Sequence, residues 1–158
     1  MGESAHRARV TFAGLVAAIA MCGGCVDNFA PDIGPQVLDK CRNRDSDPDV
    51  EVSFKDDILK GIIKGVGMCV PCHDPDGKTP QGYQVGGLNL TSHGSLMAGG
   101  VNSAADIVIP GEPCNSRLLQ KVGASPPSGS RMPLVGNPLS AKHQQLIADW
   151  IAEGALNN

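Results

Sequence analysis

The sequence predicts a small all-α domain with about three to five short helices and long loops. Three observations predict this class. The chain has 158 residues, the usual length of a single domain. It contains 20 Gly and 12 Pro but only three Phe, one Tyr and one Trp, so its core is thin and its fold rich in loops. Apolar residues recur at helical spacing in residues 53–66 and 140–153.

The charge and the cysteine content limit which binding partners and which cellular compartment are plausible for this protein. The formal net charge is −3 and there is no long basic run. We therefore expect no nucleic-acid partner, because nucleic-acid affinity depends on clustered Lys and Arg. Six Cys in so short a chain indicate an oxidising compartment, a metal site or a covalently attached cofactor. The spacing of the cysteines has to distinguish these.

The N-terminal residues 1–21 have the pattern of a secretory signal peptide. Arg7 and Arg9 precede an uninterrupted apolar run, residues 10–21. This run is too short to span a bilayer as a mature helix. A basic start followed by a short apolar run and small residues is typical of export. We expect the mature protein on the periplasmic side of a bacterial membrane.

A lipid anchor is expected directly after this segment. Cys25, which follows Gly24, and Cys22 each resemble the acceptor cysteine of a bacterial lipoprotein. Ordinary cleavage after Ala20 and a Cys22–Cys25 disulfide are the alternatives. Residues 22–52 are polar and broken by prolines, so we assign them to a flexible N-terminal tether.

Residues 53–66 predict an amphipathic helix. Ser53 is a suitable N-cap, with Asp56 as its capping-box partner. The helix leads the chain through two glycines into Cys69-Val70-Pro71-Cys72-His73. Its apolar positions are Phe54, Ile58, Leu59, Ile62, Ile63 and Val66.

The segment at residues 69–73 has the form C-x-x-C-H, the attachment sequence of c-type haem. Two thiols three positions apart can add to the two vinyl groups along one haem edge, and the next residue presents an imidazole to the iron. We therefore predict one covalent haem c bound through Cys69 and Cys72, with His73 as an axial iron ligand. A thioredoxin-like dithiol would need a βαβ context, and a zinc site would need two more ligands at close spacing.

From about Phe54 to Leu156 the chain resembles a small bacterial monohaem cytochrome c domain of the planctomycete type. This resemblance implies a class-I-like cytochrome c fold around one haem, which we place at residues 53–158. Two positions depart from the family pattern, His93 and Cys114. The landmarks, in order after the haem motif, are Gly86-Gly87-Leu88-Asn89-Leu90, Leu96-Met97-Ala98-Gly99-Gly100, Ile109-Pro110-Gly111-Glu112-Pro113, Arg131-Met132-Pro133 and Trp150-Ile151.

A six-coordinate iron needs a second axial ligand, for which the candidates are Met68, Met97, Met132, His93 and His143. Met132 is preferred because it lies in a Pro-rich loop, residues 125–138, where Pro133 fixes the backbone beside it. The resemblance to the family's Arg-Met-Pro segment agrees. Met97 fits core packing better, and we expect the two histidines to be solvent-exposed.

Two more helices are predicted. The last, residues 140–153, begins at the N-cap Ser140 and ends before Gly154. A short helix over residues 115–122 turns two leucines inward. The apolar residues expected to face the core in these helices are Leu118, Leu119, Leu146, Ile147, Trp150 and Ile151.

Cys41 and Cys114 remain after two cysteines are assigned to haem and two to the N-terminus. An exported protein seldom leaves a pair of free thiols. We therefore predict a Cys41–Cys114 disulfide that fixes the N-terminal arm to the loop before the short helix.

An iron with His and Met ligands has no vacant position for a substrate, so its chemistry is outer-sphere transfer of one electron. We expect an electron carrier, not an enzyme, that docks with redox partner proteins. The first alternative is a peroxidase-like haem enzyme or ligand sensor whose sixth ligand is displaceable. The second is a non-haem structural lipoprotein.

Overall fold

The computed structural model describes residues 41–158, which contain helices and no strand. The all-α class is therefore confirmed. The predicted signal peptide, both candidate lipid acceptors, Cys22 and Cys25, and the first part of the predicted tether lie outside the described residues. The elements are η1 (Phe54–Val66), α1 (Val70–His73), α2 (Gln81–Gly86), α3 (His93–Ala98), η2 (Ala104–Ile107), η3 (Pro113–Asn115), α4 (Arg117–Val122) and α5 (Ala141–Ala152).

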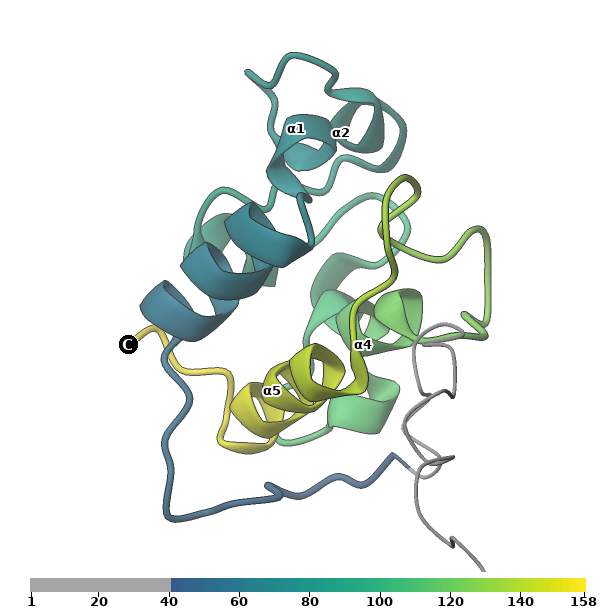
Figure 1. Ribbon diagram of the computed structural model, residues 1–158. Helices are drawn as coiled ribbons and strands as arrows, with labels where there is room; N and C mark the ends of the chain where they lie inside the picture. Colours follow the sequence, from purple (N-terminus) through teal and green to yellow (C-terminus); the bar gives the residue numbers. More distant parts are fainter. Residues whose placement is uncertain (1–40) are drawn as a thin grey trace, which may run out of the picture. The chain divides into compact units, whose positions relative to one another are not determined.

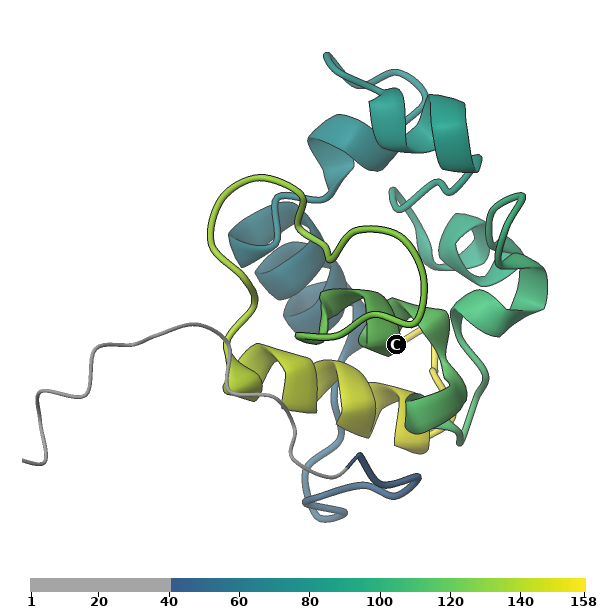
Figure 2. The same cartoon turned by 90° about the vertical axis from the view of Figure 1, so that its right-hand side faces the viewer.

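The elements that carry the predicted haem ligands come from opposite ends of the fold. α1 and α2 lie at one end, and α4 and α5 lie toward the other (Figure 1). The segment that joins α4 to α5, residues 124–138, contains Met132 and is called the Met132 loop. In two views at right angles it extends from the α4 and α5 side toward the end that carries α1 (Figures 1 and 2).

η1 begins at the predicted N-cap, because the Ser53 hydroxyl accepts a hydrogen bond from the backbone N–H of Asp56. The prediction of Asp56 as the capping-box carboxylate is wrong. Asp57 accepts the hydrogen bond from the Ser53 N–H at 2.9 Å, and Asp56 pairs with Lys60 instead. η1 is a π-helix, in which the Ile58 N–H donates to the carbonyl of Ser53. In this wider turn the Asp57 side chain, four residues after the N-cap, is the one that returns to Ser53.

Hydrophobic side chains of η1 and α5 form the centre of the core. Ile58 and Trp150 are fully buried, and the rings of Phe54 and Trp150 lie 5.4 Å apart. Val66 was expected on the same face but is 53% exposed. The backbone at Gly65 leaves helical geometry just before it, which turns Val66 out of the apolar stripe.

The two predicted C-terminal helices are present. The Ser140 hydroxyl caps α5 by accepting the His143 N–H, and Leu118 and Leu119 of α4 are buried. Ser116 precedes α4 but does not cap it with its side chain. Its buried hydroxyl instead accepts the Ile109 N–H at 2.8 Å. This bond fastens the start of α4 to the preceding loop.

Cys41 and Cys114 form the predicted disulfide, with their Cα atoms 5.6 Å apart. The side-chain carbonyl of Asn43 accepts the Cys114 N–H at 3.0 Å beside it. Cys41, the first residue that the structure describes, is therefore covalently joined to η3, the element immediately before α4.

Residues 41–52, which we had assigned to a flexible tether, are attached to α5. The backbone N–H and the hydroxyl of Ser46 donate to the Asp149 carboxylate at 2.9 and 2.7 Å. Val52 is buried, and its N–H donates to the Glu153 carboxylate at 2.9 Å. This part of the predicted tether belongs to the folded domain, because acids of α5 accept its free backbone donors.

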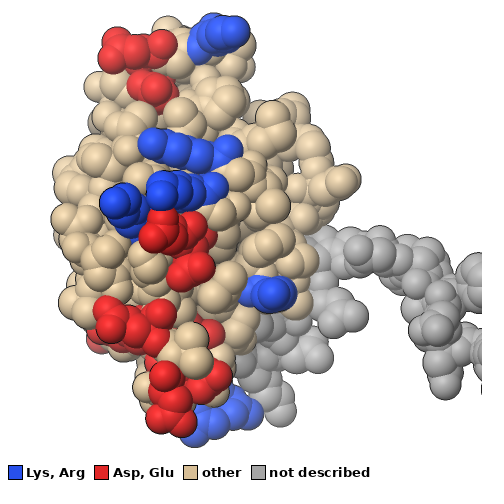
Figure 3. All heavy atoms as spheres, turned by 60° about the vertical axis from the view of Figure 1, so that its left-hand side comes forward, with Lys and Arg blue, Asp and Glu red and all other residues tan. Residues whose placement is uncertain are grey.

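Acidic residues gather around the end of α5. Partial burial raises the pKa of Glu153; the hydrogen bond from Val52 opposes this, and repulsion from Asp45, Asp149 and Glu51 adds to it. Figure 3, which brings the left side of Figure 1 forward, shows acidic side chains gathered below a group of Lys and Arg.

In residues 41–158 no helix has both the length and the apolar character needed to cross a membrane.

Candidate functional site

α1 is a single turn that carries the C-x-x-C-H segment. The carbonyl of Cys69, its N-cap, accepts hydrogen bonds from the N–H groups of Cys72 at 3.2 Å and His73 at 3.0 Å. Pro71 lies in the first turn, where a missing N–H removes no helical hydrogen bond. Both thiols are free and half-buried. The turn therefore presents two thiols and an imidazole from five consecutive residues.

The His73 ring is oriented by a backbone carbonyl. Its Nδ1 lies 3.2 Å from the carbonyl oxygen of Leu88, which can only accept, so Nδ1 carries the proton and Nε2 keeps its lone pair. The backbone carbonyl of His73 in turn accepts the Leu90 N–H at 2.9 Å. Burial lowers the pKa of His73, which favours the neutral imidazole that a metal ion requires.

α2 covers this imidazole with a glycine. A Cβ atom on Gly82 would lie 2.7 Å from both Cε1 and Nε2 of His73 and 2.9 Å from the backbone oxygen of Cys72. No side chain fits there without moving the ring or the backbone. Gly82 thus adds no side-chain atom at the Nε2 edge of His73.

The thiols do not have the character of a reactive dithiol. Burial, with a smaller contribution from Cys72, raises the pKa of Cys69 to about 11. A nucleophilic cysteine needs a lowered pKa, so the thioredoxin-like alternative has no support here. Among residues 41–158 no three or more His, Cys, Asp and Glu side chains are grouped to hold a metal ion. The zinc alternative therefore has no second pair of ligands in this range.

Met132 is half-buried and packs against the main hydrophobic core, as Cys69 and Leu88 also do. Its backbone N–H donates to the carbonyl of Lys121, in the last turn of α4, at 2.8 Å. The thioether therefore belongs to the same apolar cluster as the attachment turn, although 59 residues separate Met132 from His73.

Comparison with known families accounts for this arrangement. Residues 69–133 match the family model described as planctomycete cytochrome C. This match supports a cytochrome c-type domain in this part of the chain. The match begins at Cys69 and ends at Pro133, so it includes the complete attachment turn and Met132. Comparison with curated proteins and with solved structures gives no match to the chain.

The residues of this cytochrome domain suit the haem that such domains bind. Cys69 and Cys72 are free thiols on one turn, and Nδ1 of His73 is hydrogen-bonded so that Nε2 is left for iron. A side chain at position 82 would collide with this ring, and the glycine has none. The donor set, two thiols and one neutral imidazole, is the one that haem attachment and axial ligation require.

The other candidate ligands have different roles in the domain. His93 was expected to be exposed, but it is half-buried, and its Nε2 lies 2.8 Å from the carbonyl oxygen of Ala155. Its ring packs edge-on against Phe54, with centroids 4.9 Å apart, which ties the C-terminal residues to η1. His143, also expected to be exposed, is half-buried and hydrogen-bonded to the Ser140 hydroxyl.

The remaining methionines do not displace Met132 as the preferred candidate. Met97 lies half-buried on α3 and packs against the core, which agrees with the core-packing role expected for it. Met68 is 69% exposed and directly precedes the attachment turn. Neither lies in a loop that contains prolines on both sides of the methionine, as the Met132 loop does.

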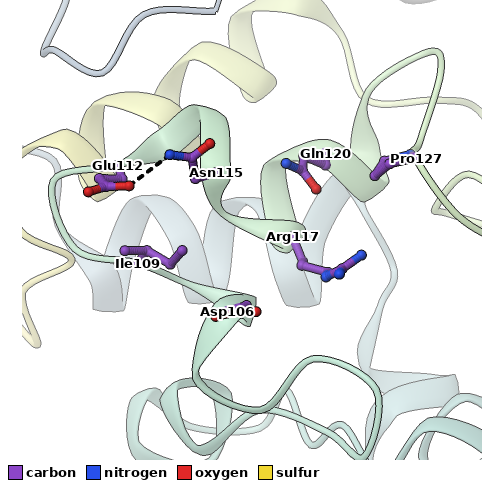
Figure 4. Close-up of a pocket in the computed structure, with 7 residues that line it drawn as sticks. All are labelled: Asp106, Ile109, Glu112, Asn115, Arg117, Gln120 and Pro127. Carbon is purple, nitrogen blue, oxygen red and sulfur yellow. Dashed lines mark hydrogen bonds between the residues drawn. The ribbon is translucent and has the colours of Figure 1, made fainter.

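A hollow of about 490 Å³ lies away from the attachment turn, beside η3 and α4. Figure 4 shows that its wall is mostly polar and that Asn115 hydrogen-bonds Glu112 across one side. None of the predicted haem ligands lines it. Its lining residues are Asp106, Ile109, Glu112, Asn115, Arg117, Gln120 and Pro127.

Sequence reasoning missed three contributors to this site. The Leu88 carbonyl and Gly82 act on His73, and Lys121 acts on Met132. Leu88 belongs to a recognised landmark of the family, but its role depends on a backbone carbonyl, which every residue carries. Nothing in the sequence distinguishes Gly82 or Lys121 from the other glycines and lysines.

Proposed function

We propose that this protein is a one-electron carrier whose single haem c is bound covalently by Cys69 and Cys72 and ligated by His73 and Met132. The observation that carries the proposal is the attachment turn, in which two free thiols adjoin an imidazole whose Nδ1 is bound to the Leu88 carbonyl. Bound haem supplies a one-electron couple at its iron.

The two cysteines fix the cofactor's position. Each thiol would add across one vinyl group, with sulfur bonding to one vinyl carbon and the thiol hydrogen going to the other, so no oxidant would be needed. Because Cys69 and Cys72 lie on the turn that also carries His73, these two thiols would hold the cofactor close to the imidazole.

The axial ligands set the chemistry that is possible. His73 would ligate through Nε2, with its orientation fixed by the Leu88 carbonyl. Met132 would supply a thioether from the other side, which raises the reduction potential and closes the sixth position to small ligands. A closed position supports electron transfer over catalysis.

The test is an absorption spectrum of protein exported from a host with haem-attachment machinery. We compare wild type, Met132→Ala and the matched control Met97→Ala, each with and without carbon monoxide. Wild type and control should show a c-type spectrum, the weak long-wavelength band of ferric Met ligation, and no carbon monoxide binding. Met132→Ala should lose the band and bind carbon monoxide. Ready carbon monoxide binding by wild type would favour the sensor or enzyme alternative, and a colourless protein would refute haem binding.

We also propose that the protein is exported and held to the periplasmic side of a membrane by a lipid on Cys25 or Cys22, from where it meets redox partner proteins. The basic start and short apolar run of residues 1–21 support this. Labelling cells with a radioactive fatty acid should mark wild type and only one of Cys25→Ser and Cys22→Ser. Label on neither wild type nor variants would refute the anchor.

A further inference from the structure

Within residues 41–158, Lys121 makes all of the hydrogen bonds to the Met132 loop. Its Nζ donates to the carbonyl of Ser128 at 3.0 Å and to that of Ser130. Its own backbone carbonyl accepts the Met132 N–H at 2.8 Å. One residue of α4 therefore contacts the loop at three points, the last of which is the predicted iron ligand.

The loop is shaped to admit this ammonium group. Gly129, between the two accepting carbonyls, has φ +61°, a left-handed conformation that costs little only for glycine. A Cβ atom on Gly129 would lie 3.3 Å from the Lys121 Nζ, closer than side chains ordinarily approach. The backbone therefore turns around the lysine and directs two carbonyls at it.

The loop has little means of ordering itself. Four of its residues are prolines, which have no N–H to donate, so a network of backbone hydrogen bonds within the loop is restricted. Lys121, in contrast, is held by a fixed element, because its neighbours Leu119 and Val122 are buried in the core. The hydrogen bonds that hold the loop therefore come from α4, and the packing of Met132 against the core adds to them. The prolines are Pro126, Pro127, Pro133 and Pro138.

We infer that Lys121 is the positioning residue for Met132: its ammonium group and backbone carbonyl hold the Met132 loop so that the thioether stays at the iron. This inference rests on the proposed His/Met ligation. Lys121 would thus control whether Met132 occupies the sixth ligand position, without being an iron ligand itself.

The experiment compares exported wild type with three variants. Lys121→Met keeps the length of the side chain but has no donor. Lys121→Arg keeps charge and donors, and Lys142→Met removes an equal charge from an exposed lysine of α5 whose side chain has no hydrogen bond within residues 41–158. Two quantities are measured: the long-wavelength band of ferric Met ligation with carbon monoxide binding, and hydrogen exchange at the Met132 amide.

Lys121→Met should lose most of the band, bind carbon monoxide, and exchange the Met132 amide at least about tenfold faster, since hydrogen bonds to a charged donor are lost. Lys121→Arg should restore both properties, and Lys142→Met should leave both unchanged. A band and an exchange rate unchanged in Lys121→Met would overturn the inference while leaving His/Met ligation intact.

The two hypotheses fail separately. If wild type itself lacks the band, the proposed ligation fails, and with it the role of Lys121 toward iron. If the band is lost equally in Lys121→Met and Lys142→Met, the effect is one of charge, and the inference is overturned. Gly129→Ala is a second variant that leaves the lysine in place, and it should weaken the band because of its positive φ and the crowding at Nζ.

Discussion

The two regions that supply the predicted iron ligands are ordered in different ways. The attachment turn is formed locally: α1 has four residues and follows directly on its N-cap Cys69, and the hydrogen bonds that define the turn join neighbours in sequence. The Met132 loop is held from outside: within residues 41–158 its hydrogen bonds all go to Lys121, and Met132 packs against the core. The turn that carries the first ligand is therefore formed locally, although Leu88 orients its ring, whereas the position of the second ligand depends on α4 being in place. We expect perturbations of the fold to release Met132 long before they affect His73.

The largest effect is expected at the attachment turn. Replacing Cys69 and Cys72 together with Ser removes both thioether bonds, so no haem should remain attached to the chain after denaturation. Haem-stained denaturing gels measure this directly. Cys41→Ser, a matched loss of a cysteine elsewhere, should keep its stain. Retained haem in the double variant would mean that attachment does not use these thiols.

Loss of the Cys41–Cys114 disulfide should destabilise mainly the Met132 loop. Replacing Cys41 and Cys114 with Ser is expected to lower the free energy of unfolding by about 2–4 kcal/mol, the usual contribution of a native disulfide. Because Cys114 lies in η3 directly before α4, the ferric Met band should be lost at a lower denaturant concentration than the His73 ligation. Simultaneous loss of both signals would contradict the distinction between the two regions.

A glycine pair in α2 tests the space beside His73. Gly82→Ala introduces a Cβ atom 2.7 Å from the ring and should destabilise the domain by about 1–3 kcal/mol, the usual cost of overpacking. Gly86→Ala is the matched control in the same helix, since a Cβ atom there meets nothing within 4 Å. Denaturant unfolding of the two variants gives the comparison. Equal free energies of unfolding for Gly82→Ala and Gly86→Ala would show that α2 can move away from the imidazole at no cost.

The smallest effect is expected far from both ligands, at Glu153. A raised pKa means that the folded state holds the proton more tightly than the unfolded state, so stability falls as pH rises through the range just above the ordinary Glu value of 4.5. Glu153→Gln keeps an acceptor for the Val52 N–H and removes this fall, with a gain below about 1 kcal/mol at neutral pH because the carboxylate is only partly buried and solvent screens its charge. Unfolding curves from pH 4 to about pH 7 measure it. A steeper fall in the variant would contradict the assignment.

The same division explains what the sequence predicted. The all-α class, the N-caps Ser53 and Ser140, and most core positions of η1 and α5 follow from local pattern and are present, with Val66 as the exception. The attachment turn was recognisable because its chemistry requires fixed spacing. The exposure of His93 was predicted wrongly because its partners, Phe54 and Ala155, are distant in sequence.

The prediction of a flexible tether was wrong for residues 41–52 for a similar reason. Residues 41–52 are polar, and polarity is a fair sign of a linker until an acid from another element accepts their donors. Asp149 and Glu153 of α5 do this. Their spacing of four residues on one helix carries no signal that distinguishes them from ordinary solvated acids. Lys121 was missed likewise, because its role exists only after the Met132 loop has folded over α4.

The Cys41–Cys114 bond also determines how the domain would carry a mechanical load. It closes a covalent ring across 73 residues, and the attachment turn lies inside that ring. A pull applied through the chain before Cys41 would pass across the sulfur bridge to η3 and α4, bypassing residues 42–113. Cys69, Cys72 and His73 would therefore bear none of the tension, and the cofactor would stay attached while the chain that leads to it is stretched.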